Sequence, residues 1–461
     1  MFYRAHRIDT KDQFTNFFIN NAPVGGKLID ISLFGCKLSF ENSEDHELLV
    51  GTFELKVLLN GYVVFSGKAL KVHANNEMVG IQFSQGTSDI NLIKSILRIN
   101  KDEHQSIYEK KDIPQVNDEF KVLTSDLCFL LSEIREDLNT SEREFKLSGS
   151  FEDSLSFTQV SIDNMITLHQ ATIFDFYQKL GNIVINLPPL ERNIHKEYFR
   201  AIFHPIVLAA PFINRAFEKP LGYARDYGLM NMLYNYEDLG PTLFDRFFHR
   251  LACNEPVAIA NKNRVVILSD ELIRLSENKS EFKVSVIACG PCRELELYLQ
   301  KLDKKPKSEM SIEFICVDSE EKAISFAYSR INTITSGYPN IRPKFLKTDP
   351  VTGLIKKKQE LIDSINESDV IISSGFFDYL SDKVAKGLVA SFSDLVKDDG
   401  TIIISNVAKG NPSIFSMSFL TEWELILRDE EDMRKLIPQD SKKKHKIIKD
   451  LNGVNYFMSI S

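Results

Sequence analysis

The sequence has 461 residues, of which 43% are hydrophobic, so it is long enough for two or three domains of ordinary size. Its 56 lysines and arginines stand against 64 acidic residues, and the formal net charge of -8 argues against general nucleic-acid binding. No apolar run approaches the ~18 residues of a membrane span and the N-terminus lacks a signal sequence, so we expect a cytoplasmic protein. The six cysteines are scattered, which predicts reduced thiols, and no spacing of His and Cys matches a zinc site.

Residues 1–100 alternate between short apolar segments and turns. Segments that resemble strands are GGKLIDISLFGCKLSF, FELKVLLN, VFSGKALKVHAN and MVGIQF, separated by Asn and Gly. A two-residue alternation between such turns is typical of antiparallel strands. The sequence therefore predicts a small antiparallel β-barrel over residues 1–100.

The segment DISLFG, from Asp30 to Gly35, is followed by an apolar strand and later by VGIQF. This pattern resembles the PilZ domain, a bacterial module for cyclic di-guanylate (cyclic di-GMP). The resemblance implies a regulatory ligand held by Arg4, Arg7, Asp30, Ser32 and Gly35, with the arginines on guanine and phosphate. The family has two arginines separated by three residues, whereas Arg4 and Arg7 are separated by two. The alternative is that Asp30 and Ser32 only stabilise a turn and that the arginines are solvated.

Residues 101–280 carry mostly helical patterns. A charged linker that ends near Pro114 is followed by amphipathic segments with few helix breakers. We expect a linker and helical region over residues 101–200 and a helical lid over residues 201–280. Such helices usually pack on something, so they could form a lid, a lever between the two ends of the chain, or the contact of a homodimer.

The stretch VSVIACGPCRELELYL, from Val284 to Leu299, admits two chemistries. A C-x-x-C motif that opens a helix is typical of thioredoxin-like oxidoreductases. Here, however, a second apolar run, IEFICVD, follows and ends in Asp318. A glycine turn after one strand and an acid at the end of the next are typical of a Rossmann-type nucleotide site. We favour the nucleotide turn and interpret Cys289 and Cys292 as small buried residues.

Three further predicted strands follow. The first ends at Asp349, the second ends near Ser374 and Gly375, and the third is introduced by a glycine turn at Gly400. Each is short and rich in Ile or Val and precedes a helical or loop segment, as expected of parallel strands covered on both faces. The sequence predicts a Rossmann-like core over residues 281–461, and the fold class of the whole chain is α/β plus β.

This series of strand ends resembles the class I S-adenosylmethionine-dependent methyltransferases. The resemblance implies that the acid after the second strand binds ribose and that an Asp after the third binds the adenine amino group. Many methyltransferases have Gly where this chain has Ala288 and Cys292. The implied cofactor-binding residues are Ala288, Cys289, Gly290, Asp318, Asp349, Ser374 and Gly375.

A more specific resemblance covers roughly the last 260 residues. It rests on HPIVLAAPFINRAFEKPLGYARDYGLMNMLYN, on NRV at residues 263–265, and on ACGPCRELE, SSGFFDYLSD and SNVAKGNPSIFSMSFLTEWELILRDEEDMRKL. These segments are similar to the bacterial methyltransferase family for biosynthesis of 3-hydroxypalmitic acid methyl ester, a quorum signal. The similarity implies methyl transfer to a small or fatty carboxylate.

The segment KPLGYARDY supplies the candidates for the acceptor site. Arg225 could neutralise a substrate carboxylate through a bidentate pair, and by resemblance Tyr223 and Asp226 would line the site. A carboxylate acceptor is already ionised at neutral pH and needs no general base. Weaker candidates are Arg264, Asn406 and Tyr379.

These patterns favour an S-adenosylmethionine-dependent methyltransferase that acts on a small or fatty carboxylate and is regulated by cyclic di-GMP. The rival is a non-catalytic cyclic di-GMP effector with a degenerate methyltransferase-like binding domain. A third interpretation is a thiol oxidoreductase that uses Cys289 and Cys292.

Overall fold

The computed structural model divides the chain into two compact units, Phe2–Ile113 and Pro114–Ser461. The division falls at Pro114, where the sequence places the end of a linker. The structure describes residues 8–10, 15–20, 22–32, 35–40, 49–59, 62–74, 78–84, 93, 115–148, 154–223, 226–235, 237–302, 308–438, 441 and 443–461.

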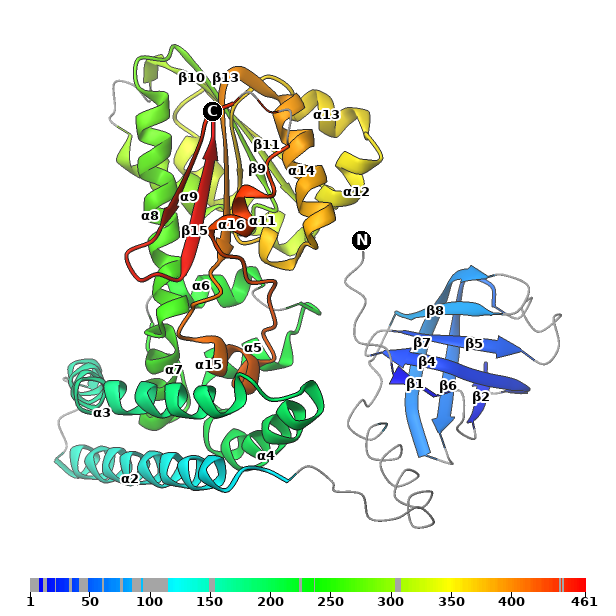
Figure 1. Cartoon of the computed structure of the whole chain (residues 1–461), viewed down its shortest axis with the longest axis vertical. Helices are drawn as coiled ribbons and strands as arrows, with labels where there is room; N and C mark the ends of the chain where they lie inside the picture. The colour runs from blue at the N-terminus through cyan, green and yellow to red at the C-terminus, as the bar shows by residue number, and fades with distance from the viewer. Residues whose placement is uncertain are drawn as a thin grey trace. The chain divides into compact units, whose positions relative to one another are not determined.

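The described residues of the N-terminal unit form an antiparallel sheet of eight strands with the order β1-β4-β5-β8-β7-β6-β2-β3 (Figure 1). Along one strand the side chains alternate, because Phe53 and Leu55 are buried whereas Glu54 and Lys56 are exposed. The predicted antiparallel strands are confirmed. They are β1 (Ile8–Asp9), β2 (Thr15–Ile19), β3 (Ala22–Val24), β4 (Gly26–Ser32), β5 (Gly35–Phe40), β6 (Thr52–Leu59), β7 (Tyr62–Ala74) and β8 (Val79–Phe83).

This sheet curls, but its described part stays open. The N–H group of Leu28 in β4 donates to Oγ1 of Thr15 in β2 at 3.2 Å, although the two strands are far apart in the sheet order. No ladder joins the end strands β1 and β3 within the described residues. Strand β3 has three residues, and its Pro23 has no N–H to donate. The predicted small antiparallel β-barrel is therefore not confirmed.

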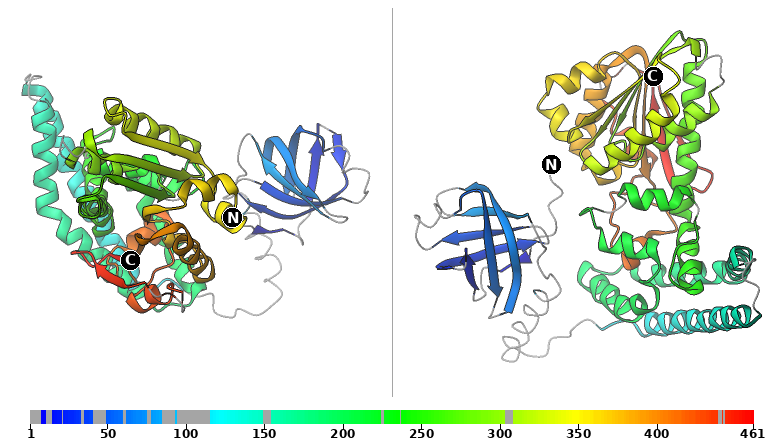
Figure 2. Two further views of the ribbon diagram at one scale, coloured as in Figure 1. Left: turned by 90° about the horizontal axis from the view of Figure 1, so that it is seen from above. Right: turned by 180° about the vertical axis from the view of Figure 1, so that it is seen from behind.

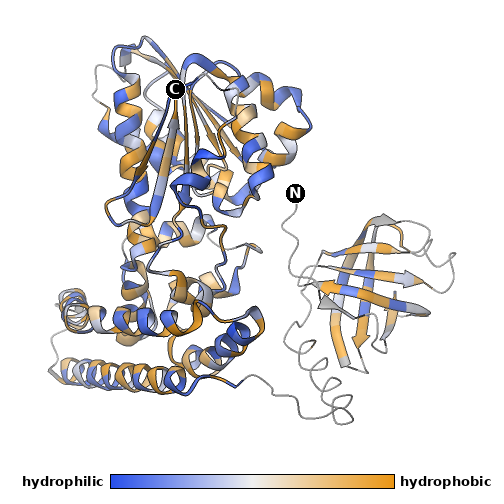
Figure 3. Cartoon of the chain, in the orientation of Figure 1, coloured by the Kyte–Doolittle hydropathy of each residue, from blue (hydrophilic) through white to orange (hydrophobic). Residues whose placement is uncertain are grey.

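Helices dominate the second unit from residue 118 to residue 276, as the sequence predicts. They bury a core rich in aromatic rings, which includes Phe120, Phe199 and Phe247. Hydrophobic and hydrophilic residues alternate around the turns of the two longest helices (Figure 3). No described helix has both the length and the apolar character needed to cross a membrane. The helices are α2 (Asp118–Ser148), α3 (Ser154–Val184), α4 (Pro189–Val207), α5 (Pro211–Glu218), α6 (Tyr227–Asn235), α7 (Leu243–Cys253) and α8 (Pro256–Ser276).

A seven-stranded sheet with the order β11-β10-β9-β12-β13-β15-β14 completes this unit. The five predicted parallel strands are confirmed, and two antiparallel strands at one edge were not predicted. The strands are β9 (Glu281–Ile287), β10 (Ser311–Asp318), β11 (Ile341–Lys347), β12 (Ser368–Ser373), β13 (Val396–Val407), β14 (His445–Lys449) and β15 (Asn455–Ile460).

Helices cover both faces of this sheet (Figure 2). One face packs against α8, α9 (Arg293–Lys301) and α11 (Glu321–Thr335). The other packs against α12 (Pro350–Ile355), α13 (Gln359–Ile365) and α14 (Asp382–Leu395). The strand order reverses between β9 and β12, and in such sheets ligands bind in the crevice at the carboxyl ends beside the reversal.

Helix α15 (Ile414–Thr421) links the sheet to the helical layer. It follows β13 in the chain and is buried from Phe415 to Thr421. Phe415 and Phe419 stack on each other, with ring centroids 4.5 Å apart, and both rings contact Phe199 of α4. The C-terminal part of the chain thus completes the core of the helices.

Candidate functional site

The turn between β9 and α9 has the backbone of a glycine-rich loop. Ala288, Gly290 and Cys292 have φ angles of 55°, 51° and 52°, in the left-handed region that favours glycine. Holding a residue with a side chain there costs roughly 1–2 kcal/mol. Ala288 and Cys292 are the two positions where many methyltransferases have glycine, and this chain keeps the glycine conformation at both.

Asp318, the last residue of β10, fastens this turn. Its Oδ2 accepts a hydrogen bond from the N–H of Gly290 at 2.8 Å, and its Oδ1 accepts one from the N–H of Glu320 at 2.9 Å. Burial raises the pKa of the Asp318 carboxyl group, while these N–H groups oppose the rise. Each carboxylate oxygen has a second lone pair, so Asp318 can hold the turn and still accept from a ribose hydroxyl.

The space beside Gly290 is open. A Cβ atom built on this glycine would have no heavy atom within 4 Å. The N–H of Thr348 donates to the backbone oxygen of Asp318 at 2.8 Å, which brings the end of β11 beside the end of β10. The turn, Asp318 and Asp349 therefore lie at neighbouring strand ends, at the edge of the sheet where such folds bind ligands in a crevice. An open glycine with a carboxylate behind it fits the S-adenosylmethionine that the sequence resemblance implies.

Asp349 is the N-cap of α12. Its Oδ1 accepts from the N–H of Thr352 at 2.6 Å, and Pro350 occupies the first turn. The structure thus places Asp349 at the end of β11 and gives it a capping role. Its contact with adenine stays a prediction.

Ser374 and Gly375 lie where β12 ends, between the ends of two neighbouring strands. The hydroxyl of Ser373 donates to the backbone oxygen of Ile287 in β9 at 3.1 Å. The N–H of Gly375 donates to Oγ of Ser405 in β13 at 3.2 Å, and the φ of Gly375 is 77°. The end of β12 is therefore fixed on both sides of the crevice.

Arg428 holds the next turn, and the sequence did not single it out. It is 1% exposed and donates to the backbone oxygens of Phe377 and Leu380 at 2.8 Å and 2.6 Å. It also donates to Oδ1 of Asn406 at 2.5 Å. These bonds join the 3-10 turn η3 (Phe377–Tyr379) to the end of β13. Asn406, a weaker candidate for the site, is thus part of the scaffold behind the crevice.

Tyr379 ends this turn and is held by an aromatic partner. Its hydroxyl oxygen accepts a hydrogen bond from Nε1 of Trp423 at 2.9 Å. An indole nitrogen can only donate, so the direction of this bond is fixed. Trp423 belongs to a small buried cluster with Val257 of α8 and Val407 of β13. Tyr379 is therefore tied to the junction between the helical layer and the sheet.

Tyr223 approaches the crevice from the helical region. Burial raises the pKa of its hydroxyl well above the ordinary value, and the charges of Asp318, Glu320 and Asp226 raise it further. Because such charges act strongly only at short range, the phenol lies close to the carboxylate that fastens the turn. Tyr223 stays protonated at neutral pH, so it can donate a hydrogen bond but cannot serve as a base.

Asp226 is engaged in the structure of α6. Its Oδ1 accepts from Nε of Arg215 and from the N–H of Leu229, both at 2.8 Å, and it is 2% exposed. These are the contacts of a helix cap and a buried ion pair. The neighbouring candidate Arg225 lies outside the described residues.

Three buried thiols, of Cys289, Cys292 and Cys316, lie together beneath the turn. The hydrogen-bonding neighbours Cys289 and Cys316, together with burial, raise the pKa of the Cys292 thiol well above its usual value. A thiol-disulfide enzyme instead needs an accessible thiol of low pKa. The environment of Cys292 is that of a small core residue.

The residues predicted to bind cyclic di-GMP are described only in part. Asp30 lies in β4, and Ser32 pairs with Gly35 across the β4–β5 hairpin. A Cβ atom at Gly35 would lie 2.4 Å from the backbone oxygen of Ile81, so packing against β8 requires glycine there. Arg4, Arg7 and the side chain of Ser32 lie outside the described residues. Binding stays a prediction.

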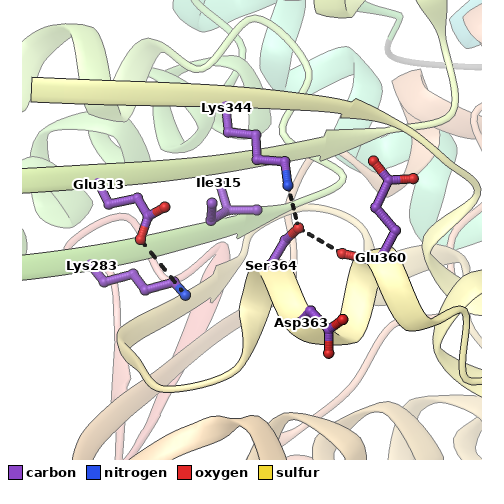
Figure 4. A pocket seen from close by; sticks show the side chains of 7 residues that line it. All are labelled: Lys283, Glu313, Ile315, Lys344, Glu360, Asp363 and Ser364. Carbon is purple, nitrogen blue, oxygen red and sulfur yellow. Dashed lines mark hydrogen bonds and ion pairs between the residues drawn. The ribbon is translucent and has the colours of Figure 1, made fainter.

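A polar cavity of ≈ 530 Å³ lies away from the strand ends that carry the candidates (Figure 4). Lys283 Nζ lies 3.7 Å from Oε2 of Glu313, and Lys344 donates to Oγ of Ser364 at 2.8 Å. Its lysines are thus engaged by the protein. The cavity is lined by Lys283, Glu313, Ile315, Lys344, Glu360, Asp363 and Ser364.

A second cavity, of ≈ 600 Å³, borders the crevice at Glu320. Tyr227 and Phe326 form part of its wall, with ring centroids 5.7 Å apart. Because Tyr227 is the last residue of KPLGYARDY, this cavity adjoins the predicted acceptor side.

Within the described residues, no group of three or more His, Cys, Asp or Glu side chains could hold a metal ion.

Comparison with known proteins gives structural neighbours but no family. No protein-family model matches the chain, and no curated protein matches it. Solved structures that it resembles include a possible exported protein from Bordetella parapertussis, at 14% identity and a TM-score of 0.39, covering 63% of this chain and 96% of that one.

Several of the neighbours are S-adenosylmethionine-dependent methyltransferases. Magnesium protoporphyrin IX methyltransferase from Synechocystis, solved with bound S-adenosylmethionine, has 14% identity and a TM-score of 0.32 over 51% of this chain and 97% of its own. An O-methyltransferase family protein from Burkholderia thailandensis has 13% identity and a TM-score of 0.33 over 58% and 70%. At these identities and TM-scores the neighbours transfer no activity to this chain, and its function must be argued from its own residues.

Proposed function

We propose that this protein is an S-adenosylmethionine-dependent methyltransferase that methylates an oxygen of a small or fatty carboxylate. The observation that carries the proposal is the bond from the N–H of Gly290 to Oδ2 of Asp318, at 2.8 Å, beneath an open glycine face. It stands beside the strand reversal, where α/β sheets bind ligands.

The residues around the crevice would divide the work of binding. Asp318 would hold the turn and accept from the ribose hydroxyls, and Asp349 would face the adenine. When bound, S-adenosylmethionine supplies a methyl group on a positively charged sulfur, which is already activated for transfer. The remaining task is to align the acceptor oxygen and to exclude water.

A carboxylate acceptor is supported by Tyr223 and Asp226, the described residues of the predicted acceptor side, because Tyr223 stays a donor and Oδ1 of Asp226 is already engaged. Asp226 is held by Arg215 and by the N–H of Leu229. Tyr223 has a raised pKa and stays protonated. An alcohol or amine acceptor would usually need a base, whereas a carboxylate arrives ionised. Tyr223 would donate a hydrogen bond to it, and Arg225 would neutralise its charge.

Isothermal titration calorimetry tests the cofactor. We expect the wild-type chain to bind S-adenosylmethionine and S-adenosylhomocysteine, and Asp318→Ala to lose this binding. Glu321→Ala is the matched control, because this exposed carboxylate lies three residues after Asp318 and is paired with Lys347. A folded wild-type protein that binds neither ligand would overturn the proposal.

Mass spectrometry tests the acceptor. The protein would be incubated with S-adenosylmethionine that carries a deuterated methyl group and with matched acids, alcohols and amines of equal chain length. We expect labelled methyl esters from the acids alone. Labelled ethers or methylamines would refute the carboxylate assignment while leaving methyl transfer intact.

The regulatory part of the proposal concerns the N-terminal unit. Cyclic di-GMP would bind at the β4–β5 hairpin, where Ser32 pairs with Gly35 and Asp30 precedes them. Arg4 and Arg7 would clamp its guanine and phosphate groups. Binding there would change the activity of the second unit.

A further inference from the structure

Asn261 of α8 is a buried amide without a visible partner. It is 0% exposed, and neither its oxygen nor its nitrogen makes a hydrogen bond to any described residue. A buried polar group left unpaired is destabilising, because it has given up its hydrogen bonds to water. Most buried polar side chains in folded proteins are paired, and Asn261 is the one described residue of this chain whose donor and acceptor groups are both left over, so it points to a polar ligand.

The position of Asn261 on the helix shows where such a ligand would lie. Residues that follow one another at three or four positions share a helix face, so Val257, Asn261, Arg264 and Leu268 form one buried stripe of α8. Figure 1 shows α8 running from the helical layer up along the sheet.

The neighbours at the two ends of this stripe fix its place in the fold. Val257 belongs to the cluster that contains Val407, the last residue of β13. Leu268 belongs to the cluster that contains Cys289 and Cys292 of the turn. Asn261 and Arg264 lie between these two contacts, on the face of α8 that is turned toward the ends of β9 and β13.

Two charged side chains accompany the amide. Arg264 is 6% exposed, and it lies close enough to Glu294 in the first turn of α9 to lower the pKa of that carboxyl group. Burial has the larger effect and raises the pKa of Glu294 to about 7. The crevice wall thus offers one permanent cation, one titrating acid, and an amide that both donates and accepts.

This combination complements a zwitterion. A guanidinium and an amide N–H pair with a carboxylate, while a carboxyl group and an amide oxygen pair with an ammonium group. We propose that Asn261, Arg264 and Glu294 form a polar subsite for the amino-acid end of S-adenosylmethionine, with Asn261 supplying its orphan amide. This inference rests on the proposed function, because it assigns the part of the cofactor that Gly290 and Asp318 do not reach.

Calorimetry with two ligands tests the subsite. S-adenosylhomocysteine has the amino-acid end, whereas methylthioadenosine shares the adenosine and the thioether but lacks that end. We expect Asn261→Ala to weaken S-adenosylhomocysteine about tenfold, the loss of one to two hydrogen bonds, and to leave methylthioadenosine unchanged. Asn263→Ala is the matched control, since this asparagine is two positions along and faces another side of α8.

A second variant addresses the folded state without ligand. Asn261→Leu is nearly isosteric and removes the buried amide, so the ligand-free protein should melt at a higher temperature than wild type while losing affinity for S-adenosylhomocysteine. A purely structural asparagine would instead give a lower melting temperature.

The outcomes separate the subsite from the function. Equal losses of both ligands in Asn261→Ala, or no loss of either, would overturn the subsite and leave the cofactor assignment standing. A wild-type protein that binds neither ligand would overturn both. A selective loss of S-adenosylhomocysteine, with Asn263→Ala unchanged, is the expected result.

Discussion

The N–H of Gly290 donates to Oδ2 of Asp318 at 2.8 Å, so the turn after β9 and the acid that ends β10 form one unit. A mutation in either residue therefore acts on both the shape of the turn and the carboxylate beside it. The two residues are 28 positions apart in the sequence, and this hydrogen bond joins them in the fold.

Asp318→Ala should lower the free energy of unfolding by about 1–3 kcal/mol, because it leaves the buried N–H groups of Gly290 and Glu320 without acceptors. Urea denaturation followed by circular dichroism measures this loss. Asp318→Asn keeps one side-chain oxygen, so its free energy of unfolding should lie between those of wild type and Asp318→Ala. Unchanged stability in Asp318→Ala would show that the turn does not depend on the carboxylate.

Ala288→Gly should stabilise the protein, by roughly 1 kcal/mol, because the half-buried Ala288 has a φ of 55°. Ala171→Gly is the control, since this exposed alanine lies inside α3 and its replacement should cost about 1 kcal/mol. Opposite signs in thermal or chemical unfolding are expected. A loss of stability at position 288 would contradict the left-handed turn.

Glu255→Gln should remove part of the pH dependence of stability. Burial raises the pKa of Glu255 from 4.5 to about 7, although hydrogen bonds from Ser416 and Ser413 oppose the rise. The folded protein therefore binds this proton more tightly than the unfolded chain. The contribution is fully present below pH 4.5 and is lost as the pH rises through about 7, on the order of 3 kcal/mol.

Unfolding free energies measured between pH 4.5 and pH 8 check this expectation. Across the range wild type should lose stability relative to Glu255→Gln, which lacks this contribution, while His249, whose pKa burial lowers to about 4, acts with the opposite sign in both proteins. Glu294, whose pKa is also raised to about 7, contributes with the same sign, so a residual slope is expected in the single variant. Parallel profiles for the variant and wild type would refute the assignment to Glu255.

Arg428→Lys should destabilise the protein by about 3 kcal/mol despite keeping the charge. An ammonium group cannot reach the oxygens of Phe377, Leu380 and Asn406 at once, as the planar guanidinium does. Arg274→Lys, in an exposed pair with Glu271, is the control and should change little. Differential scanning calorimetry of both variants makes the comparison, and similar melting temperatures would contradict the network.

Cyclic di-GMP should bind the full chain, and Arg4→Ala or Arg7→Ala should abolish the binding, since each removes a guanidinium that pairs with phosphate. Calorimetric titration measures it, with Lys56→Ala, an exposed cation on β6, as the control. Equal affinity in all variants would place the ligand elsewhere. No heat of binding in wild type would remove the regulatory proposal.

The parallel strands could be predicted because each is a continuous apolar run that stops at a polar or glycine residue. Strands β14 and β15 escaped prediction for two reasons. In β14 only Ile447 is even half-buried, so no alternation marks it, and β15 is buried on both sides at the end of the chain. Tertiary pairing, and not local pattern, makes both of them strands.

The residues of the site also divide into those that the sequence predicts and those that only the fold shows. Asp318 could be predicted because a carboxylate that ends an apolar run is unusual, and its position beside Gly290 follows from the parallel pairing of β9 and β10. Arg428, in contrast, acts by donating hydrogen bonds to the backbone oxygens of Leu380 and Phe377, which are 48 and 51 positions earlier in the chain. A set of carbonyl groups leaves no trace in the sequence, so only the fold reveals it.

The place of α15 has a consequence for how the protein is made. Nε of Arg200 in α4 donates to the backbone oxygen of Phe419, 219 residues further along the chain. During synthesis the helices therefore leave the ribosome long before α15, and until α15 packs, the apolar surface that it covers stays exposed. A fragment that stops after α8 would expose this surface permanently, so the helical layer should aggregate when it is expressed alone.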